Sequence, residues 1–204
     1  MPAGLPDYAE LQCASNFSFL RGASHPEQLV ARAAELGYRS LAITDECSVA
    51  GVVRAHGEAK QHGLQLIVGT QFRVQGQGAL LNFRLIALAM NRNGYGNLCE
   101  LITLARNREH KGSYRIDAQD FTQPPVELSH LRGLPDCLLL LAPDYGVAPE
   151  LVQRQAGWLR ATFGERARLA LTLLYRGQDE AHKASVLQAA ALHGLKVAAT
   201  GDVC

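Results

Sequence analysis

The stretch that decides the fold is residues 40–48, which read Ser40-Leu41-Ala42-Ile43-Thr44-Asp45-Glu46-Cys47-Ser48. A short apolar run ends in three polar residues, and Ser48 then offers a start for a helix. Such a run is typical of a buried parallel strand, and both open α/β sheets and α/β barrels place their chemistry where these strands end. The stretch therefore predicts an α/β fold with a candidate site at the carboxyl ends of its strands.

The same pattern returns at the end of the sequence. An apolar run over residues 195–200 leads into Gly201, Asp202, Val203 and Cys204. Carboxyl ends of parallel strands meet at one edge of a sheet. We therefore expect the polar residues that follow these two strands to lie in the same structural region.

Composition indicates one globular domain. The sequence has 204 residues, of which 48% are hydrophobic and 6% aromatic. This is typical of a folded chain with a full core. Positive and negative residues are interleaved and the formal net charge is +1. Because no basic stripe follows from this pattern, the sequence argues against direct nucleic-acid binding by this segment.

The cysteines predict neither a disulfide framework nor a zinc site. There are five of them at irregular spacing and no Cys-x-x-Cys pair, so we interpret them as buried, reduced thiols. No early apolar run resembles a signal peptide, and no apolar run is long enough to span a bilayer. We expect a soluble, cytoplasmic protein with no membrane partner.

Apolar periodicity and breakers predict seven strands that alternate with helices. The strands are expected over residues 8–13, 39–44, 64–69, 80–89, 137–142, 168–174 and 195–200. Longer helices are expected after residue 24 and over 48–61, 93–105, 149–163 and 179–193, with a short helix at 117–121. The helix after residue 24 is expected to begin with a capping box between Ser24 and Glu27.

This alternation predicts a parallel sheet covered by helices, either open or closed. We find no internal repeat, low-complexity tract or linker, so residues 1–204 are expected to form one domain. The last predicted strand stops two residues before Asp202, with no closing helix. We therefore expect the sequence to be the N-terminal piece of a longer protein.

Several stretches, taken in order, resemble the PHP (polymerase and histidinol phosphatase) domain that opens bacterial C-family DNA polymerases, in particular their error-prone branch. They are residues 8–13, 15–26, 41–47, 51–55, 67–72, 93–98 and 199–203. The resemblance covers essentially the whole chain and is most specific in the first third. It implies a distorted (β/α)7 TIM-like barrel, here incomplete at the C-terminus, which agrees with the alternation of strands and helices.

Active members of this family bind up to three metal ions through His, Asp and Glu and hydrolyse phosphoesters, a reaction that such metal sites suit. The resemblance places this sequence's residues at most of those ligand positions. The opening His-x-His falls on Gln12 and Ala14, and the next ligand falls on Arg21. The later positions fall on Glu46, Gln71, Asp202 and Cys204. Only Asp202 keeps the family's residue type, so the resemblance implies a degenerate metal site and no catalytic residue in this segment.

Three of these residues remain weak candidates for a metal. Glu46, Asp202 and Cys204 carry groups that bind zinc or manganese. One alternative is therefore a residual metal-dependent phosphoesterase or 3′–5′ exonuclease. The other alternative is structural: Glu46 caps the next helix or faces solvent, Asp202 makes hydrogen bonds at a strand end, and Cys204 is an inert thiol.

Arg21 suggests how the vacated site is filled. A guanidinium bridges carboxylates and neutralises them without a metal. We expect Arg21 to pair with Glu46 or Asp202, because a fixed cation stands where the family has a ligand.

The resemblance also implies a function. It points to a polymerase of damage-induced mutagenesis, DNA repair and translesion synthesis, in which this domain is a scaffold without a cofactor of its own. The parent polymerase would use Mg or Mn. The implied partners are the rest of the polymerase chain, DNA through that chain, mutasome proteins and a sliding clamp.

An unrelated TIM-barrel enzyme is a third alternative. Such an enzyme would have a Gly-rich phosphate-binding loop after its late strands. Only the single glycines Gly177 and Gly201 follow those strands here.

Overall fold

The computed structural model describes residues 7–204 as seven strands and five α-helices. The strands are β1 (Ala9–Cys13), β2 (Ser40–Ile43), β3 (Gln65–Val74), β4 (Phe83–Ala89), β5 (Cys137–Ala142), β6 (Ala167–Leu171) and β7 (Lys196–Ala199). The α-helices are α1 (Pro26–Glu35), α2 (Val52–His62), α3 (Arg92–Asn107), α4 (Pro149–Phe163) and α5 (Asp179–His193). Short 3-10 helices are η1 (Gly78–Leu80), η2 (Ala118–Phe121), η3 (Val126–Leu131) and η4 (Gly164–Arg166). The predicted order of elements is confirmed.

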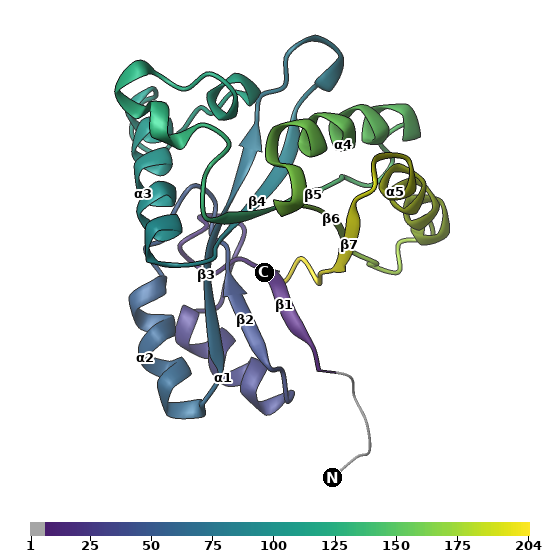
Figure 1. Ribbon diagram of the computed structural model, residues 1–204. Coiled ribbons are helices and arrows are strands. Elements are labelled where there is room, and N and C mark those ends of the chain that lie inside the picture. Colours follow the sequence, from purple (N-terminus) through teal and green to yellow (C-terminus); the bar gives the residue numbers. More distant parts are fainter. Residues whose placement is uncertain (1–6) are drawn as a thin grey trace.

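The strands form one curled sheet in the order β1 to β7, with the helices packed around its outside (Figure 1). The prediction of an all-parallel sheet was wrong at one strand, because β4 runs antiparallel to both β3 and β5. Only residues 75–82 connect β3 to β4. A parallel crossover needs about a dozen residues or more, so this short connection forces a hairpin.

The curled sheet is an incomplete TIM-like barrel whose two edges meet at one point. Val203 pairs with Cys13 of β1: the Val203 amide donates to the Gln12 carbonyl at 3.0 Å, and the Ala14 amide donates to the Val203 carbonyl at 2.8 Å. Figure 1 accordingly places the C-terminal end beside β1. Glu10, only 1% exposed, adds to this contact by accepting from the Gly201 amide at 2.9 Å.

Apolar side chains fill both faces of the sheet. A cluster made only of strand residues, including Ala42, Ile86 and Leu140, lies inside the curl. The alternate residues face outward. Strands β3 to β6 pack outward mainly on α3, α4 and α5, and β1 and β2 pack on α1 and α2. Because β2, β4 and β5 are buried on both faces, they read in the sequence as continuous apolar runs, whereas β7 is partly exposed.

Two helices begin at residues other than those predicted. Helix α2 begins at Val52 and not at Ser48, because Cys47 has a φ of 47° and residues 48–51 form a loop. Helix α1 is capped at His25 and not at Ser24. The Gln28 side chain accepts from the His25 amide at 2.9 Å, which is the role expected of Glu27.

The five cysteines are free, and three of them, Cys13, Cys47 and Cys137, are buried as predicted. Cys99 is half-buried, and Cys204 is exposed, which differs from the buried thiol that we expected. Among the helices of residues 7–204, none is long and apolar enough to cross a membrane.

Two glycines of α3 provide a matched test of the packing between α3 and β5. A Cβ on Gly94 would lie 2.1 Å from the Asp136 carbonyl oxygen, whereas a Cβ on Gly96 would meet nothing within 4 Å. We expect Gly94→Ala to lower the free energy of unfolding. Gly96→Ala should raise it by about 0.5–1 kcal/mol, because alanine is the better helix former. Urea denaturation checks both, and equal effects would contradict this packing.

Candidate functional site

The polar side chains gather at the edge of the barrel where the parallel strands end. Asp45 and Glu46 follow β2, Asp144 follows β5 and Asp202 follows β7. The first residues of β4 lie at this same edge, because β4 is antiparallel to its neighbours. Arg84, near the start of β4, therefore joins the carboxylates.

Asp45 holds the loop that follows β1 and does not line an open site. Its side chain is fully buried and accepts hydrogen bonds from the Ser15 amide, the Ser15 hydroxyl and the Ser18 hydroxyl, each at 2.7 Å. These bonds satisfy a buried carboxylate without a cation. The loop over residues 15–22 is thereby fixed against the end of β2.

Glu46 is held by a cation and a phenol. The Arg21 guanidinium donates to one carboxylate oxygen at 3.0 Å, and the Tyr114 hydroxyl donates to the other at 2.7 Å. Burial and the neighbouring carboxylate raise the pKa of Tyr114, so this hydroxyl stays a donor at neutral pH. The predicted pairing of Arg21 with Glu46 is confirmed, and Glu46 neither caps a helix nor extends into solvent.

Asp202 joins both ends of the chain to the middle of the sheet. Its Oδ1 accepts from the Gln12 side-chain amide at 2.6 Å, and its Oδ2 accepts from the Arg84 guanidinium at 2.8 Å. The Arg21 guanidinium lies 3.9 Å from Oδ1. Asp202 thus has the strand-end hydrogen-bonding role that was one of our alternatives, and Arg21 reaches both predicted partners.

Asp144 bridges two arginines that stand opposite each other on neighbouring strands. Arg73 of β3 and Arg84 of β4 are directly paired in register, an arrangement that is unfavourable for like charges. Arg73 donates to Asp144 at 2.6 Å and Arg84 donates to its other oxygen at 3.0 Å. Burial would raise the pKa of the Asp144 carboxyl, but the two arginines hold it below its usual range.

These contacts make a continuous ion-pair network of three guanidinium groups and three carboxylates. Its members are Arg21, Arg73, Arg84, Glu46, Asp144 and Asp202. The formal charges cancel. Burial lowers the pKa of the Arg84 guanidinium, but Asp202 and Asp144 outweigh burial and raise it. The Arg84 guanidinium therefore stays charged at neutral pH between its two carboxylate partners.

The other predicted site residues have separate roles. Ala14 is buried, and its backbone amide closes the barrel through Val203. The Gln71 side-chain amide donates to the Thr44 carbonyl at 2.9 Å, while its Oε1 is buried and accepts no hydrogen bond. Cys204 is exposed, and its thiol makes no hydrogen bond to the described residues. The structure therefore brings Glu46 and Asp202 onto Arg21 but does not bring Cys204 into the network.

Sequence reasoning missed Arg73, Arg84 and Tyr114. Arg84 had a signal, since it is the one charged residue within the apolar run 80–89. Its place at the site edge depends on β4 being antiparallel, which the pattern did not reveal. Asp144 does follow a predicted strand, but its two partners come from that same unrecognised hairpin.

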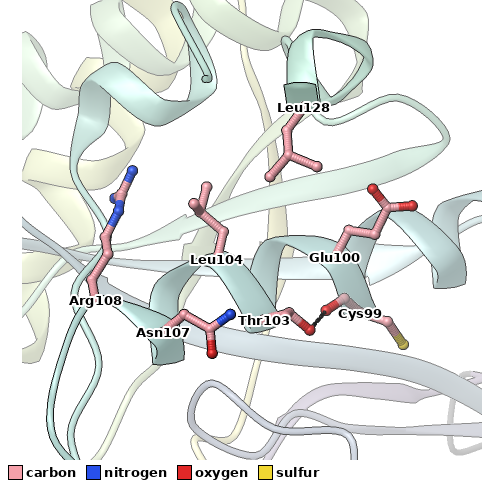
Figure 2. Close-up of a pocket in the computed structure, with 7 residues that line it drawn as sticks. All are labelled: Cys99, Glu100, Thr103, Leu104, Asn107, Arg108 and Leu128. Carbon is pink, nitrogen blue, oxygen red and sulfur yellow. Dashed lines mark hydrogen bonds between the residues drawn. The ribbon is translucent and has the colours of Figure 1, made fainter. Parts of the chain in front are cut away.

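No group of three or more His, Cys, Asp or Glu side chains within residues 7–204 has the geometry to hold a metal ion. Each network carboxylate instead faces a guanidinium. A pocket of about 370 Å³ lies elsewhere, between α3 and η3 (Figure 2). Its charged residues Glu100 and Arg108 are already paired with His130 and Asp120. This pocket is therefore separate from the strand-end site.

Fold and site together define an α/β protein with a TIM-like barrel and a polar network where its strands end. The family model of the PHP domain matches residues 10–194, and the chain belongs to this family.

Within this family, the chain is similar to error-prone DNA polymerases. The chain is 52% identical over 203 residues to an error-prone DNA polymerase of Ralstonia nicotianae, covering 100% of this chain and 19% of the relative. It is 54% identical over 202 residues to an error-prone DNA polymerase of Bordetella parapertussis, covering 99% of this chain and 19% of the relative. The chain thus spans about a fifth of the length of these curated relatives. A solved amidohydrolase from Chromobacterium violaceum shares the fold, with a TM-score of 0.67, 14% identity and coverage of 96% of this chain and 87% of that one.

Replacing Asp144 tests the network. Asp144→Asn removes the carboxylate that lies between Arg73 and Arg84, and within residues 7–204 only Arg84 keeps another carboxylate partner, Asp202. We therefore expect a loss of about 1.5–3 kcal/mol in the free energy of unfolding. The control is Asp7→Asn, which removes the partner of Arg39 in a pair whose side chains are 70% and 78% exposed. The control should change stability by less than about 0.5 kcal/mol. Equal losses in urea denaturation would show that the network adds nothing.

Comparing the wild-type chain with Asp144→Asn at different pH values gives a second test of the network. The pKa of Asp144 is lowered from its ordinary value of 3.8. A lowered pKa stabilises the fold above the unfolded pKa, and this stabilisation is lost as pH falls through the folded pKa. The stability difference between wild type and Asp144→Asn should therefore be full at pH 7 and shrink below about pH 4. If the stability difference between the two proteins stayed constant down to pH 3, the ionised Asp144 carboxylate would not be its cause.

Proposed function

We propose that the chain is the N-terminal PHP domain of an error-prone DNA polymerase, and that it acts as a structural scaffold without hydrolytic activity of its own. The observation that carries this proposal is the Arg21 guanidinium, which lies 3.0 Å from Glu46 and 3.9 Å from Asp202. These carboxylates stand at strand ends, where the family resemblance places metal ligands. Their charge is already neutralised by the chain itself.

The donor set at this edge does not fit a two- or three-metal site. Gln12 offers a neutral amide that is already bonded to Asp202, and Ala14 offers no side-chain ligand. Arg21 brings a fixed positive charge, because a guanidinium does not lose its proton in proteins. A cation that entered between Glu46 and Asp202 would have to displace this guanidinium. We therefore derive no metal-dependent step for this chain.

The similarity to longer polymerases supports a role for this chain within such a protein. We propose that the domain braces the polymerase body, which carries out nucleotidyl transfer with Mg or Mn during translesion synthesis and DNA repair. On this proposal DNA is contacted through the polymerase body, a sliding clamp and mutasome proteins are further partners, and the protein works in the cytoplasm. The balanced charge of the chain supports an indirect contact with DNA, since phosphate binding favours a basic surface.

Metal content and hydrolysis test this proposal together. We expect the purified chain to hold less than one equivalent of any transition metal after dialysis. We also expect no cleavage of a phosphodiester or a DNA 3′ end with added Mn²⁺ or Zn²⁺. The physical reason is that guanidinium groups already neutralise the carboxylates. Elemental analysis and product release measure the two quantities, with an active metal phosphoesterase as the positive control.

One outcome would establish the alternative enzyme. Stoichiometric metal, together with Mn²⁺-dependent cleavage that Asp202→Ala abolishes, would mean that Glu46, Asp202 and Cys204 form a working site. Ser48→Ala is the control, because Ser48 follows β2, as Glu46 does, but lies outside the network. Cleavage that persists unchanged in Asp202→Ala would instead indicate a contaminating nuclease.

A further inference from the structure

The loop between β1 and α1 presents apolar side chains to solvent beside the ion-pair network. Phe19 is 86% exposed and Leu20 is 90% exposed. Leu20 has a φ of 62°, in the left-handed region that a leucine seldom occupies. Packing within this domain does not explain two adjacent exposed apolar side chains, one of them on a residue in the left-handed region.

Hydrogen bonds hold the backbone of the loop in the conformation that directs these side chains outward. The amides of Arg21 and Gly22 both donate to the Ser18 carbonyl at 3.0 Å. The Ser18 hydroxyl is in turn bonded to buried Asp45 at 2.7 Å. The outward direction of Phe19 and Leu20 is therefore a property of the folded loop and not of one side-chain rotamer.

A hollow of about 380 Å³ adjoins the exposed pair. Phe17 and Phe19 line it on one side, and Tyr114 lines it on another, with Glu46 and Arg106 as its charged members. Both charged groups are engaged: Glu46 binds Arg21, and Arg106 donates to the Glu46 and Cys47 carbonyls. The hollow therefore offers an apolar side chain aromatic contacts without a free charge to bury.

We propose that Phe19, Leu20 and this hollow form the docking surface for the polymerase segment that follows residue 204 in chains of this family. This inference rests on the proposed function. The curated relatives are about five times as long as this chain, so most of such a polymerase lies outside the described residues. A segment of that polymerase supplies the apolar side chains that cover Phe19 and Leu20.

The position of the C-terminal residues favours the following polymerase segment over a separate partner as the occupant of this surface. Arg21, the residue after Leu20, lies 3.9 Å from Asp202. Val203 pairs with β1 at Gln12 and Ala14, immediately before the loop begins. A polypeptide that continues beyond Cys204 therefore starts near the loop that carries the exposed pair. Its effective concentration at this surface is high, which favours docking without a separate binding partner.

Hydrogen exchange measured on two chains tests the proposal. Within the described residues, the Phe19 and Leu20 amides make no hydrogen bond. In the 204-residue chain they should exchange close to the rate of an unprotected peptide. In the full-length polymerase, docking should slow them by about tenfold or more. Equal exchange in the two chains would overturn the docking proposal.

Substitutions separate docking from a general effect of chain length. Phe19→Ser combined with Leu20→Ser should remove the added protection in the full-length polymerase. Val53→Ser should leave it intact, since Val53 is 82% exposed on α2. Protection that appears in the 204-residue chain as its concentration rises would point to a second copy as the occupant and overturn the proposal. None of these outcomes depends on metal or hydrolysis, so the scaffold proposal and the docking proposal can fail separately.

Discussion

The structure depends on one guanidinium, that of Arg84, which binds two carboxylates from distant parts of the chain. Arg84 joins β4 to Asp144 after β5 at 3.0 Å and to Asp202 after β7 at 2.8 Å. Asp202 also binds Gln12 of β1. Arg84, in the middle of the sheet, is thereby connected to both edges of the barrel, directly to Asp202 after β7 and through Asp202 to β1. Because the Arg84 side chain is only 16% exposed, removing either carboxylate would leave a largely buried charge with fewer partners.

The two edges of the sheet meet through an isolated bridge and not through a full strand pair. Val203 supplies two backbone hydrogen bonds to β1, and Glu10 adds a bond to Gly201 from a buried carboxylate. Burial raises the pKa of Glu10, while the amides of Gly201 and Gln12 favour its ionised form. Closure at this point therefore relies on polar contacts, whereas the rest of the barrel relies on apolar packing.

The sequence predicted the elements well where apolar periodicity was decisive. The bounds of α4, α5 and β5 match the prediction, and Arg21 finds the carboxylates that its position suggested. The direction of β4 was not predictable from periodicity, because a strand buried on both faces reads the same in either direction. Reversing β4 is what brings Arg84 to the site edge. The prediction therefore found Arg21, Glu46 and Asp202. It missed Arg73, Arg84 and Asp144, and of these three only Arg84 owes its place to the direction of β4.

The ion-pair network also fixes the composition of this edge of the barrel. A site of His, Asp and Glu ligands is filled to a degree that follows the metal concentration around it. Here both signs of charge are encoded in one polypeptide, in the ratio of three arginines to three carboxylates. The charges that face one another at this edge are therefore inherited together, as parts of one polypeptide.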